Sequence, residues 1–356
     1  MLKKTIIFNI ILNSMNIEEF YYELPKDLIA QMPTQKRSQS KMLVLDVVED
    51  RILHRKFSDI IEYFDEGDVL VLNDTLVQKA RVVGNKKTGG KVELLFFKNT
   101  SLSNNYLALV KGRVGERAKV LVGGLEIEIK KFKENFYVVD EADNIVEEIM
   151  SKYGMIPLPP YIKRKPEKED EEWYQTIFGC KKGSIASPTA SLHFQDDIVL
   201  KLKEKGVVFT FITLHVGPGT FLPVKVKDLE SHNMLPEYCE VSQETANTIN
   251  NAIKQGKNVL FCGTTVVRAI EWASKEGVVT PKKGYADIFI YPGYTFKIVR
   301  NMLTNFHLPS STPLLLVCAL AGKDRIFKAY SEAIFLKYRF FSYGDAMLIW
   351  KGKSNV

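Results

Sequence analysis

The chain has five histidines, and four of them, His193, His215, His232 and His307, lie between positions 193 and 307. Each stands beside small or turn-forming residues at the end of a predicted segment. Imidazole exchanges protons near neutral pH, so the group fits acid–base or substrate-orienting chemistry. No two of the four have the spacing of metal ligands on one helix, and we expect no metal. For any single histidine, a hydrogen-bonded structural role is the alternative.

His215 ends a predicted strand over 207–216, and Gly217 and Gly219 follow it directly. Ligands of α/β proteins gather beyond the carboxyl ends of strands. A glycine there lets the backbone approach a ligand closely, because it has no Cβ. The segment is therefore a candidate binding loop, although a Gly-x-Gly pair alone is a weak signal.

A second strand end carries hydroxyls and an arginine. The predicted strand over 258–263 runs through Gly263 into a helix that starts with Thr264 and Thr265. The first N–H groups of a helix have no partner within it, so they can bind a carboxylate, another anion or a ribose hydroxyl. Arg268 follows one turn later on the same side and would complete a carboxylate clamp. An ordinary capped turn is the alternative.

Two further segments hold polar groups beside turns. His307 lies in a loop with Pro309, just before a helix that Ser311 is predicted to cap. Asp345 follows Gly344 at the start of a predicted strand, as a turn residue or as a catalytic or ribose-binding carboxylate. Tyr343 is either part of the core or a ring on which a base stacks.

Composition describes the molecule that must position these groups. The 356 residues are 46% hydrophobic and 26% charged, which excludes a disordered or fibrous chain. The length predicts about two domains. The formal net charge of +7 is mild, so it permits a polyanionic partner without requiring one.

The cysteines and the apolar runs indicate a cytoplasmic protein. Four scattered cysteines show neither a disulfide framework nor a zinc motif. No apolar run reaches the ~20 residues that span a bilayer, so we expect no membrane partner. Residues 1–14 resemble a short signal peptide, but Asn9 and Asn13 interrupt it and no cleavage motif follows. Because Met15 opens a natural start, we interpret residues 1–14 as a mis-start or a disordered extension.

Two patterns of hydrophobicity divide the chain. Short apolar runs at 42–46 and 68–74, and strands and helices from about 183 onward, are typical of an α/β fold. Within the later part we predict a helix that Ser242 caps, a helix after Gly263 that stops near Gly277, a strand and a turn over 287–294, and a helix over 324–340. Residues 79–150 instead alternate with a period of two between glycine turns, which predicts a small antiparallel barrel or sandwich. We therefore predict an α/β domain formed by two chain segments, 15–76 and 152–356, interrupted by an inserted all-β domain, a small barrel, at 77–151.

The positive charge is concentrated in the β segment. Residues 79–133 hold 13 Lys or Arg and four Asp or Glu, a net charge of +9, which exceeds that of the whole chain. Such a surface is a candidate for RNA binding, with Lys111, Arg113 and Arg117 as the residues that would contact phosphates. A solvated strand face is the alternative.

A set of longer motifs resembles one known family. They are PTASLHF, LHVGPGTF, GTT-x-x-R-x-x-E, PGY-x-F, TNFHLP-x-ST and YRFFSYGDAML, preceded by YELP-x-x-LIAQ-x-P, LVLND and GMIPLPPYI. In this order, from about Phe20 to Ile349, they resemble the S-adenosylmethionine:tRNA ribosyltransferase-isomerases of queuosine biosynthesis.

The resemblance implies an α/β domain interrupted by a β-barrel, and an unusual reaction. S-adenosylmethionine would serve as the donor of a ribosyl unit to 7-aminomethyl-7-deazaguanine at the wobble position of tRNA. The unit becomes an epoxycyclopentanediol, which gives epoxyqueuosine, and adenine and methionine leave. The implied partners are S-adenosylmethionine as co-substrate and the anticodon stem-loop of tRNA. We expect a monomer with no permanently bound cofactor.

The resemblance also suggests roles for residues. His215, His193 and His307 would transfer protons, and Asp345 would bind a ribose hydroxyl. Thr264, Thr265 and Arg268 would hold the methionine carboxylate. Substrate-binding roles would extend to further motif positions: Gly217, Gly219, His232, Ser310, Thr312, Tyr343 and Arg339.

Five positions depart from the family pattern: Leu76, Ser191, Leu235, Val266 and Arg300. Leu235 matters most, because a histidine is usual there and a polar group near His232 is lost. Two alternatives remain open. One is a catalytically decayed RNA-binding protein on the same scaffold, and the other is an S-adenosylmethionine-consuming enzyme that acts on a small nucleoside.

Overall fold

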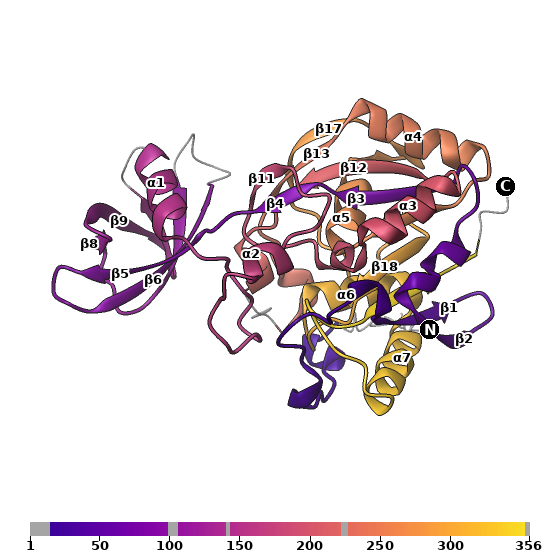
Figure 1. Cartoon of the computed structure of the whole chain (residues 1–356), viewed down its shortest axis with the longest axis horizontal. Coiled ribbons are helices and arrows are strands. Elements are labelled where there is room, and N and C mark those ends of the chain that lie inside the picture. Colours follow the sequence, from indigo (N-terminus) through magenta and orange to yellow (C-terminus); the bar gives the residue numbers. More distant parts are fainter. Residues whose placement is uncertain (1–14, 99–105, 140–142, 222–226, 353–356) are drawn as a thin grey trace, which may run out of the picture.

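The computed structural model describes residues 15–98, 106–139, 143–221 and 227–352. The predicted extension, residues 1–14, lies outside the described residues. Figure 1 shows an α/β body with a small β-barrel to one side of it. Both parts were expected from the patterns of hydrophobicity, and the barrel prediction is confirmed.

One mixed sheet of nine strands forms the centre of the α/β body. Strands β12, β3, β14 and β18 are parallel and occupy its middle, so their carboxyl ends meet at one edge. The order across the sheet is β17 (Lys282–Ala286), β13 (Glu237–Val241), β12 (Val208–Leu214), β3 (Val69–Asn73), β14 (Val259–Cys262), β18 (Asn301–Asn305), β19 (Ala346–Trp350), β1 (Lys41–Asp46) and β2 (Arg51–Lys56). Strands before and after the barrel segment therefore share one sheet.

Helices cover both faces of this sheet. On one face lie α4 (Gln243–Lys254), α5 (Thr264–Ala273), α6 (Thr312–Ala321) and α7 (Lys323–Phe335). On the other lie α3 (Asp196–Glu204) and a 3-10 helix at Phe57–Tyr63. Val69 and Val71 of β3 pack in the first layer, and Leu70 and Leu72 pack in the second. Burial on both faces explains why this strand is a continuous apolar run.

The barrel closes on itself through six antiparallel strands. Their order around it is β10 (Phe136–Val139), β7 (Tyr106–Lys111), β6 (Lys91–Lys98), β5 (Arg81–Lys86), β8 (Arg117–Val122) and β9 (Leu125–Lys133). Every second residue points inward, as the alternation predicts. Helix α1 (Asp143–Tyr153), which the sequence analysis did not predict, buries Val146, Ile149 and Met150 in the barrel core.

Two extended segments connect the barrel to the body. β4 (Thr75–Val77) follows β3 after one residue and pairs in parallel with β11 (Lys181–Ser184) on the returning chain. Arg81 and Met155 form a bridge where the chain enters and leaves the barrel. The short helix α2 (Asp170–Trp173) lies on the returning segment, where Asp170 accepts two hydrogen bonds from Arg164 at 2.6 and 2.7 Å.

Two predicted helix starts are confirmed by their caps. The Ser242 hydroxyl accepts a hydrogen bond from the backbone of Thr245, and Ser311 does the same for Leu314. The helix predicted to stop near Gly277 ends earlier, at Ala273. A hairpin of β15 (Ser274–Lys275) and β16 (Val278–Val279) follows, because Glu276 and Gly277, with φ of 50° and 76°, make a tight turn.

One predicted element is partly wrong and another is longer than the structure has it. Residues 287–294 were expected to form a strand and a turn; the turn is present, but the strand β17 precedes them and the apolar side chains at 288–290 line a pocket instead. The helix predicted over 324–340 is confirmed as α7 but ends at Phe335, and Lys337 has a φ of 53°. Hydrophobic spacing reports which side chains are buried, and Ile290 and Tyr338 are buried outside the predicted strand and helix.

The fully buried side chain of Asn73 joins three elements at the carboxyl edge of the sheet. Its Oδ1 accepts from the N–H of Leu214 and of Thr75, both at 3.1 Å. Its Nδ2 donates to the carbonyl of Leu214 at 3.0 Å and to Oγ1 of Thr265 at 3.3 Å. One amide thus ties the end of β3 to β12 and to α5.

Asn73→Ala should lower the free energy of unfolding by about 2–4 kcal/mol, because it leaves buried N–H and C=O groups unpaired. Urea denaturation followed by circular dichroism measures this change. Asn247→Ala, on the exposed side of α4, is the matched control and should unfold like the unchanged protein. Equal stability of the two variants would contradict the role assigned to Asn73.

Candidate functional site

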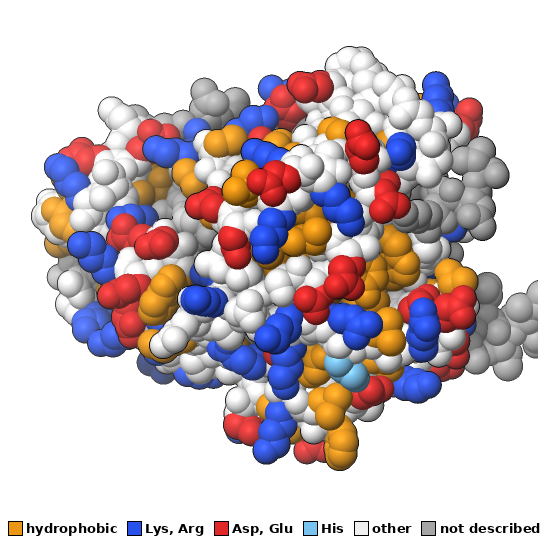
Figure 2. Space-filling view, turned by 45° about the vertical axis from the view of Figure 1, so that its right-hand side comes forward, with side chains coloured by type: hydrophobic (Ala, Val, Ile, Leu, Met, Phe, Trp, Pro, Cys, Tyr) orange, Lys and Arg blue, Asp and Glu red, His pale blue; other side chains and the backbone are white. Residues whose placement is uncertain are grey.

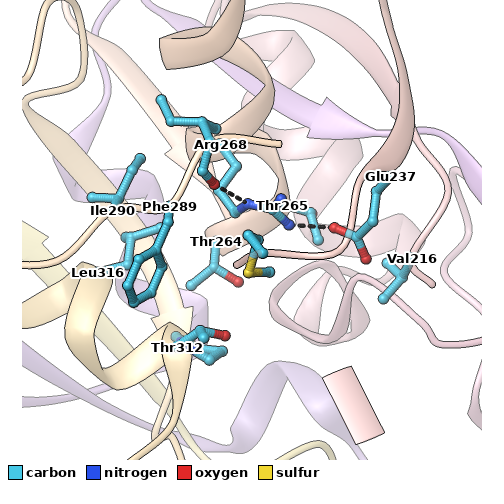
Figure 3. A pocket seen from close by; sticks show the side chains of 12 residues that line it. Val216, Glu237, Thr264, Thr265, Arg268, Phe289, Ile290, Thr312 and Leu316 are labelled. Carbon is cyan, nitrogen blue, oxygen red and sulfur yellow. Dashed lines mark hydrogen bonds and ion pairs between the residues drawn. The ribbon is translucent and has the colours of Figure 1, made fainter. Parts of the chain in front are cut away.

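A pocket opens at the carboxyl edge of the sheet, beside α5 and α6 (Figure 3). It has a polar side formed by α5 and β13 and an apolar side formed by the segment after β17 and by α6. Its lining residues are Val216, Met234, Glu237, Thr264, Thr265, Arg268, Ile288, Phe289, Ile290, Thr312, Pro313 and Leu316. The position beyond parallel strand ends is where α/β proteins bind ligands.

The start of α5 forms the floor of the polar side. Gly263 precedes the helix with a φ of 96°, a backbone conformation that a side chain would strain. Thr264 and Thr265, the first two residues of this ten-residue helix, line the pocket, and the first N–H groups of a helix have no partner within it. This arrangement suits a carboxylate or a ribose hydroxyl.

Arg268 is buried and already bound to a carboxylate. Its Nη1 donates to Oε2 of Glu237, a contact drawn in Figure 3. Its Nε and Nη2 donate to the carbonyls of Ile288 and Ala286 at 3.2 and 3.3 Å. A guanidinium has five N–H groups, so these three contacts leave two for a ligand.

Glu237 is a site residue that the sequence analysis missed. It is 4% exposed, and its second oxygen accepts from the N–H of Gly217 at 2.7 Å. It therefore holds both Arg268 and the loop after β12. The available signal was an acidic residue at an inward-facing position of the alternating run 237–241.

The apolar side is flat and partly aromatic. Phe289 stands between Ile288 and Ile290, and the edge of the His232 ring meets its ring at a centroid distance of 4.9 Å. Burial lowers the pKa of His232. Leu235, the main departure from the family pattern, is 37% exposed, lies against Gly219 and follows the pocket residue Met234 in the chain. The predicted residues His232 and Gly219 therefore border the pocket.

His215 stands at the carboxyl end of β12, next to the pocket residue Val216. Its Nδ1 lies 2.8 Å from Oγ1 of Thr75, and its ring stacks on Tyr238 at 5.2 Å. A Cβ on Gly183 would come within 2.5 Å of the ring, so glycine makes room for it. The pKa of His215 is lowered, chiefly by burial. It is therefore held as the neutral form, which is able to accept a proton.

A polar cluster surrounds this histidine. Asp74 accepts from Thr213 at 2.7 Å and lies 3.5 Å from the Lys181 ammonium group. Lys181 also donates to Thr213 at 2.9 Å. The carboxylate of Asp74 raises the pKa of His215 and so opposes the effect of burial.

His193 lies inside the core. Its Nδ1 is 2.9 Å from Oγ of Ser40, its Nε2 is 3.1 Å from Nδ2 of Asn305, and its ring stacks on Phe57. Ser40 donates its own proton to the carbonyl of Arg37, so the imidazole carries its proton on Nδ1. Burial lowers the pKa of His193 to about 3. Both nitrogens are therefore engaged within the protein.

His307 is fixed by its backbone and by one ring nitrogen. Its Nε2 lies 2.8 Å from Oγ1 of Thr304, its N–H donates to the Tyr330 hydroxyl at 2.9 Å, and the Tyr22 hydroxyl donates to its carbonyl. Burial lowers the pKa of His307 to about 3. Ser310, two residues before the pocket residue Thr312, binds the carbonyls of Phe20 and Ile17.

The motif over 338–348 holds its polar side chains in the fold. Both oxygens of Asp345 accept backbone N–H groups, from Lys41 at 2.9 Å and from Arg339 at 2.8 Å. Burial raises the pKa of Asp345. Tyr343 donates to Asp170 at 2.8 Å, and Arg339 donates to the carbonyl of Met32. None of the three lines the pocket.

The predicted residues thus divide into two groups. The structure brings together Thr264, Thr265, Arg268 and Thr312 in the pocket, with His215, Gly217, Gly219 and His232 at its border. Outside the lining lie His193, His307, Ser310, Arg339, Tyr343 and Asp345. Two of the residues that depart from the family pattern are buried: Ser191 beside Cys262, and Val266 within α5.

The predicted RNA-binding residues are exposed at one end of the barrel. Lys111 ends β7, Arg117 begins β8, and Arg113 lies between them. Lys86, at the end of β5 away from Arg81, donates to the carbonyl of Arg113. The three residues therefore lie at the end of the barrel opposite to its junction with the body.

In residues 15–98, 106–139, 143–221 and 227–352, no group of His, Cys, Asp and Glu is arranged to hold a metal ion. Within those same ranges, the helices are too short or too polar to cross a bilayer.

Comparison with known proteins gives consistent matches. The model of the family described as "Queuosine biosynthesis protein" matches residues 17–349. The chain is 45% identical over 342 residues to the S-adenosylmethionine:tRNA ribosyltransferase-isomerase of Acetivibrio thermocellus, covering 94% of this chain and all of the relative. It is 47% identical over 348 residues to the protein of the same name from Clostridioides difficile, with the same coverage.

A solved structure also matches. The S-adenosylmethionine tRNA ribosyltransferase of Thermotoga maritima superimposes with a TM-score of 0.55 at 31% identity. The match covers 93% of this chain and all of that one. Sequence and structure comparisons therefore agree over nearly the whole chain.

The buried His193 predicts a pH-dependent stability. Its pKa of about 3 in the folded state lies below the ~6.5 of an unfolded histidine, so acid favours the unfolded state as the pH falls from about 6.5 toward 3. Between pH 7 and pH 5 the protein should lose about 2 kcal/mol more stability than the His193→Gln variant. Urea unfolding at both pH values measures this difference. Parallel losses in the two proteins would contradict it.

Proposed function

Because the chain belongs to the queuosine biosynthesis family of S-adenosylmethionine:tRNA ribosyltransferase-isomerases, we propose that it modifies the wobble base of tRNA. It transfers the ribosyl unit of S-adenosylmethionine to 7-aminomethyl-7-deazaguanine and isomerises it to an epoxycyclopentanediol. The products are epoxyqueuosine, adenine and methionine. Identity of about half the residues across the full length of curated relatives is the observation that carries this proposal.

S-adenosylmethionine binds in the pocket at the start of α5. The methionine carboxylate meets Thr264, Thr265 and the two N–H groups of Arg268 that the protein leaves unused. Glu237 supports this role, because it fixes the guanidinium before the ligand arrives. The apolar side with Phe289 offers a surface for the adenine ring.

The chemistry requires a base and an acid. The sulfonium acidifies the adjacent 5′ carbon, and a base removes its proton. The electron pair forms a double bond between the 5′ and 4′ carbons, the 4′ C–O bond breaks, and the ring oxygen becomes a carbonyl at the 1′ carbon as adenine leaves, protonated by the acid. The amine of the deazaguanine adds to the 4′ carbon of this vinyl sulfonium and loses a proton, which returns an electron pair to the 5′ carbon. The 5′ carbon attacks the 1′ carbonyl and closes a five-membered carbon ring, and the alkoxide formed displaces methionine from the 5′ carbon to give the epoxide.

His215 and His307 are the residues we assign to proton transfer. Each has one ring nitrogen bound to a threonine hydroxyl, which orients the ring. Burial lowers the pKa of both, so each imidazole is neutral at pH 7 and has one ring nitrogen without a proton. His193 and Asp345 act as positioning residues, because His193 joins Ser40 to Asn305 and Asp345 binds two backbone segments.

The two parts of the molecule divide the substrates. Residues 15–76 and 152–356 form an α/β domain that holds S-adenosylmethionine, and residues 77–151 are an inserted barrel domain that contacts the anticodon stem-loop of tRNA through Lys111, Arg113 and Arg117. The net charge of +9 in residues 79–133 supports this division. The protein acts as a monomer and uses no bound cofactor.

The direct test is to incubate the protein with S-adenosylmethionine and tRNA that bears the deazaguanine precursor, and to measure free adenine. Adenine release that depends on the modified tRNA is expected. Release without tRNA would instead indicate an enzyme for small nucleosides. No release under any condition, with tRNA binding retained, would indicate a decayed RNA-binding protein.

His215→Ala and His307→Ala should each lower turnover by about 10²- to 10⁴-fold, the usual contribution of a general acid or base. Single-turnover formation of epoxyqueuosine in tRNA measures the effect. Circular dichroism melting curves check that both variants fold. Turnover near that of the unchanged protein in both variants would refute the acid–base assignment.

Replacement of Lys111, Arg113 and Arg117 by alanine should weaken tRNA binding and make it less sensitive to salt. Log K falls as log salt rises, and each lost phosphate contact makes this slope less steep by about 0.7–0.9. Binding is measured by fluorescence anisotropy over a series of salt concentrations. An unchanged slope would show that these side chains do not contact phosphates.

A further inference from the structure

Three aromatic rings form a continuous row across β12, β13 and β17, near the pocket but not within it. The His215 ring stacks on Tyr238 at a centroid distance of 5.2 Å and an interplanar angle of 19°. Tyr238 meets Tyr285, its direct partner in the sheet register, edge to face at 6.0 Å. The chemistry of the pocket described above uses neither tyrosine.

Tyr238 and Tyr285 lie on the face of the sheet opposite to the pocket. Glu237 points to the pocket, so Tyr238, the next residue of the strand, points to the other face. His215 follows Leu214, the last residue of β12, and precedes the pocket residue Val216, so it stands at the carboxyl edge of the sheet where the two faces meet. A nucleic acid that passes the end of β12 therefore reaches both the row and the pocket.

Tyr285 is the accessible ring of the row. Its side chain is 43% exposed, whereas the next residue, Ala286, is fully buried against the helices of the opposite face. β17 is the edge strand of the sheet, and α5 packs on its other side. A tyrosine that served only the core would be covered, so this position suits a ligand.

The charges around the row compensate one another. Glu240 accepts from the Tyr238 hydroxyl at 2.9 Å and lies 3.7 Å from the Lys283 ammonium group, and Asp74 pairs with Lys181. Figure 2 likewise shows basic and acidic side chains interspersed on the face it displays. The row therefore offers ring faces rather than a field of positive charge, and ring faces bind nucleobases by stacking.

The barrel lies near the same place. β11 contacts β6 of the barrel, and Gly183 of β11 lies against the His215 ring. The His215 end of the row therefore faces the barrel. An RNA loop that contacted both parts of the protein would pass over the row.

We propose that Tyr285, supported by Tyr238 and His215, is a stacking platform for an unpaired base of the tRNA loop next to the nucleotide being modified. This inference rests on the proposed function. Loop bases of RNA are unstacked and are commonly recognised by aromatic rings. Placing a neighbouring base on the platform holds the loop open and directs the target base past the end of β12 into the pocket.

The test uses an RNA hairpin whose loop has the anticodon-loop sequence. The loop carries the fluorescent base 2-aminopurine next to the nucleotide that is modified. Binding to the unchanged protein should quench the 2-aminopurine fluorescence, because stacking does so. Tyr285→Ala should abolish the quenching and weaken binding about 5- to 100-fold, the effect of one lost base–aromatic stack. Tyr285→Phe retains the ring and should bind like the unchanged protein.

Controls separate stacking from charge and from misfolding. Tyr21→Ala removes another exposed tyrosine, 65% accessible, and should leave hairpin binding unchanged. An RNA duplex offers no unpaired base, so Tyr285→Ala should not alter its binding. For hairpin binding, the slope of log K against log salt should be the same in Tyr285→Ala as in the original protein, because no phosphate contact is lost.

Two results would overturn the platform. In the first, Tyr285→Ala binds the hairpin and quenches its fluorescence as the original protein does, and the original protein releases adenine with modified tRNA. This result would refute the platform but leave the proposed function standing. The other is failure of the unchanged protein to release adenine at all, which would overturn the proposed function and this inference with it.

Discussion

The site depends on one buried amide. Asn73 ends the central strand, and its hydrogen bonds fix the end of β12 and the first turn of α5 relative to that strand. The same hydrogen bonds place His215 and Thr265 beside the end of β3, because Asn73 holds the backbone of Leu214, which precedes His215, and the side-chain hydroxyl of Thr265. The next two residues, Asp74 and Thr75, contact Lys181 and His215. Three consecutive residues therefore position groups from distant parts of the chain.

A buried ion pair is the second constraint. Removing Arg268 and Glu237 from water is costly, and such a pair often contributes little to stability. Its value here is orientation. Glu237 and two carbonyls hold the guanidinium, so its orientation beside the pocket is fixed by the protein itself. Because Glu237 also binds Gly217, the arginine and the loop after β12 are held in a fixed relation.

Local signals in the sequence predicted the elements, and long-range contacts decided the roles of residues. Ser242 and Ser311 predicted helix starts because capping acts within one turn, and alternation predicted the barrel strands because each strand buries every second residue. The residues of the pocket on α5 were predicted from a strand end and a helix start. The hydrogen bonds of both His193 ring nitrogens could not be predicted, because their partners Ser40 and Asn305 lie 153 and 112 positions away in the sequence. Glu237 was missed for the same reason, since its partner Arg268 is 31 positions further along the chain.

The position of the barrel within the chain bears on how the protein folds during synthesis. β3 emerges from the ribosome before the barrel, yet both of its parallel neighbours, β12 and β14, are made after it. The barrel strands pair with one another within residues 81–139, whereas the apolar strand Val69–Asn73 lacks both of its neighbours until β12 and β14 are made. Chains at this stage therefore expose an apolar strand, the kind of intermediate on which chaperones act. The length of the inserted barrel therefore determines how long the α/β body lacks its later strands during synthesis.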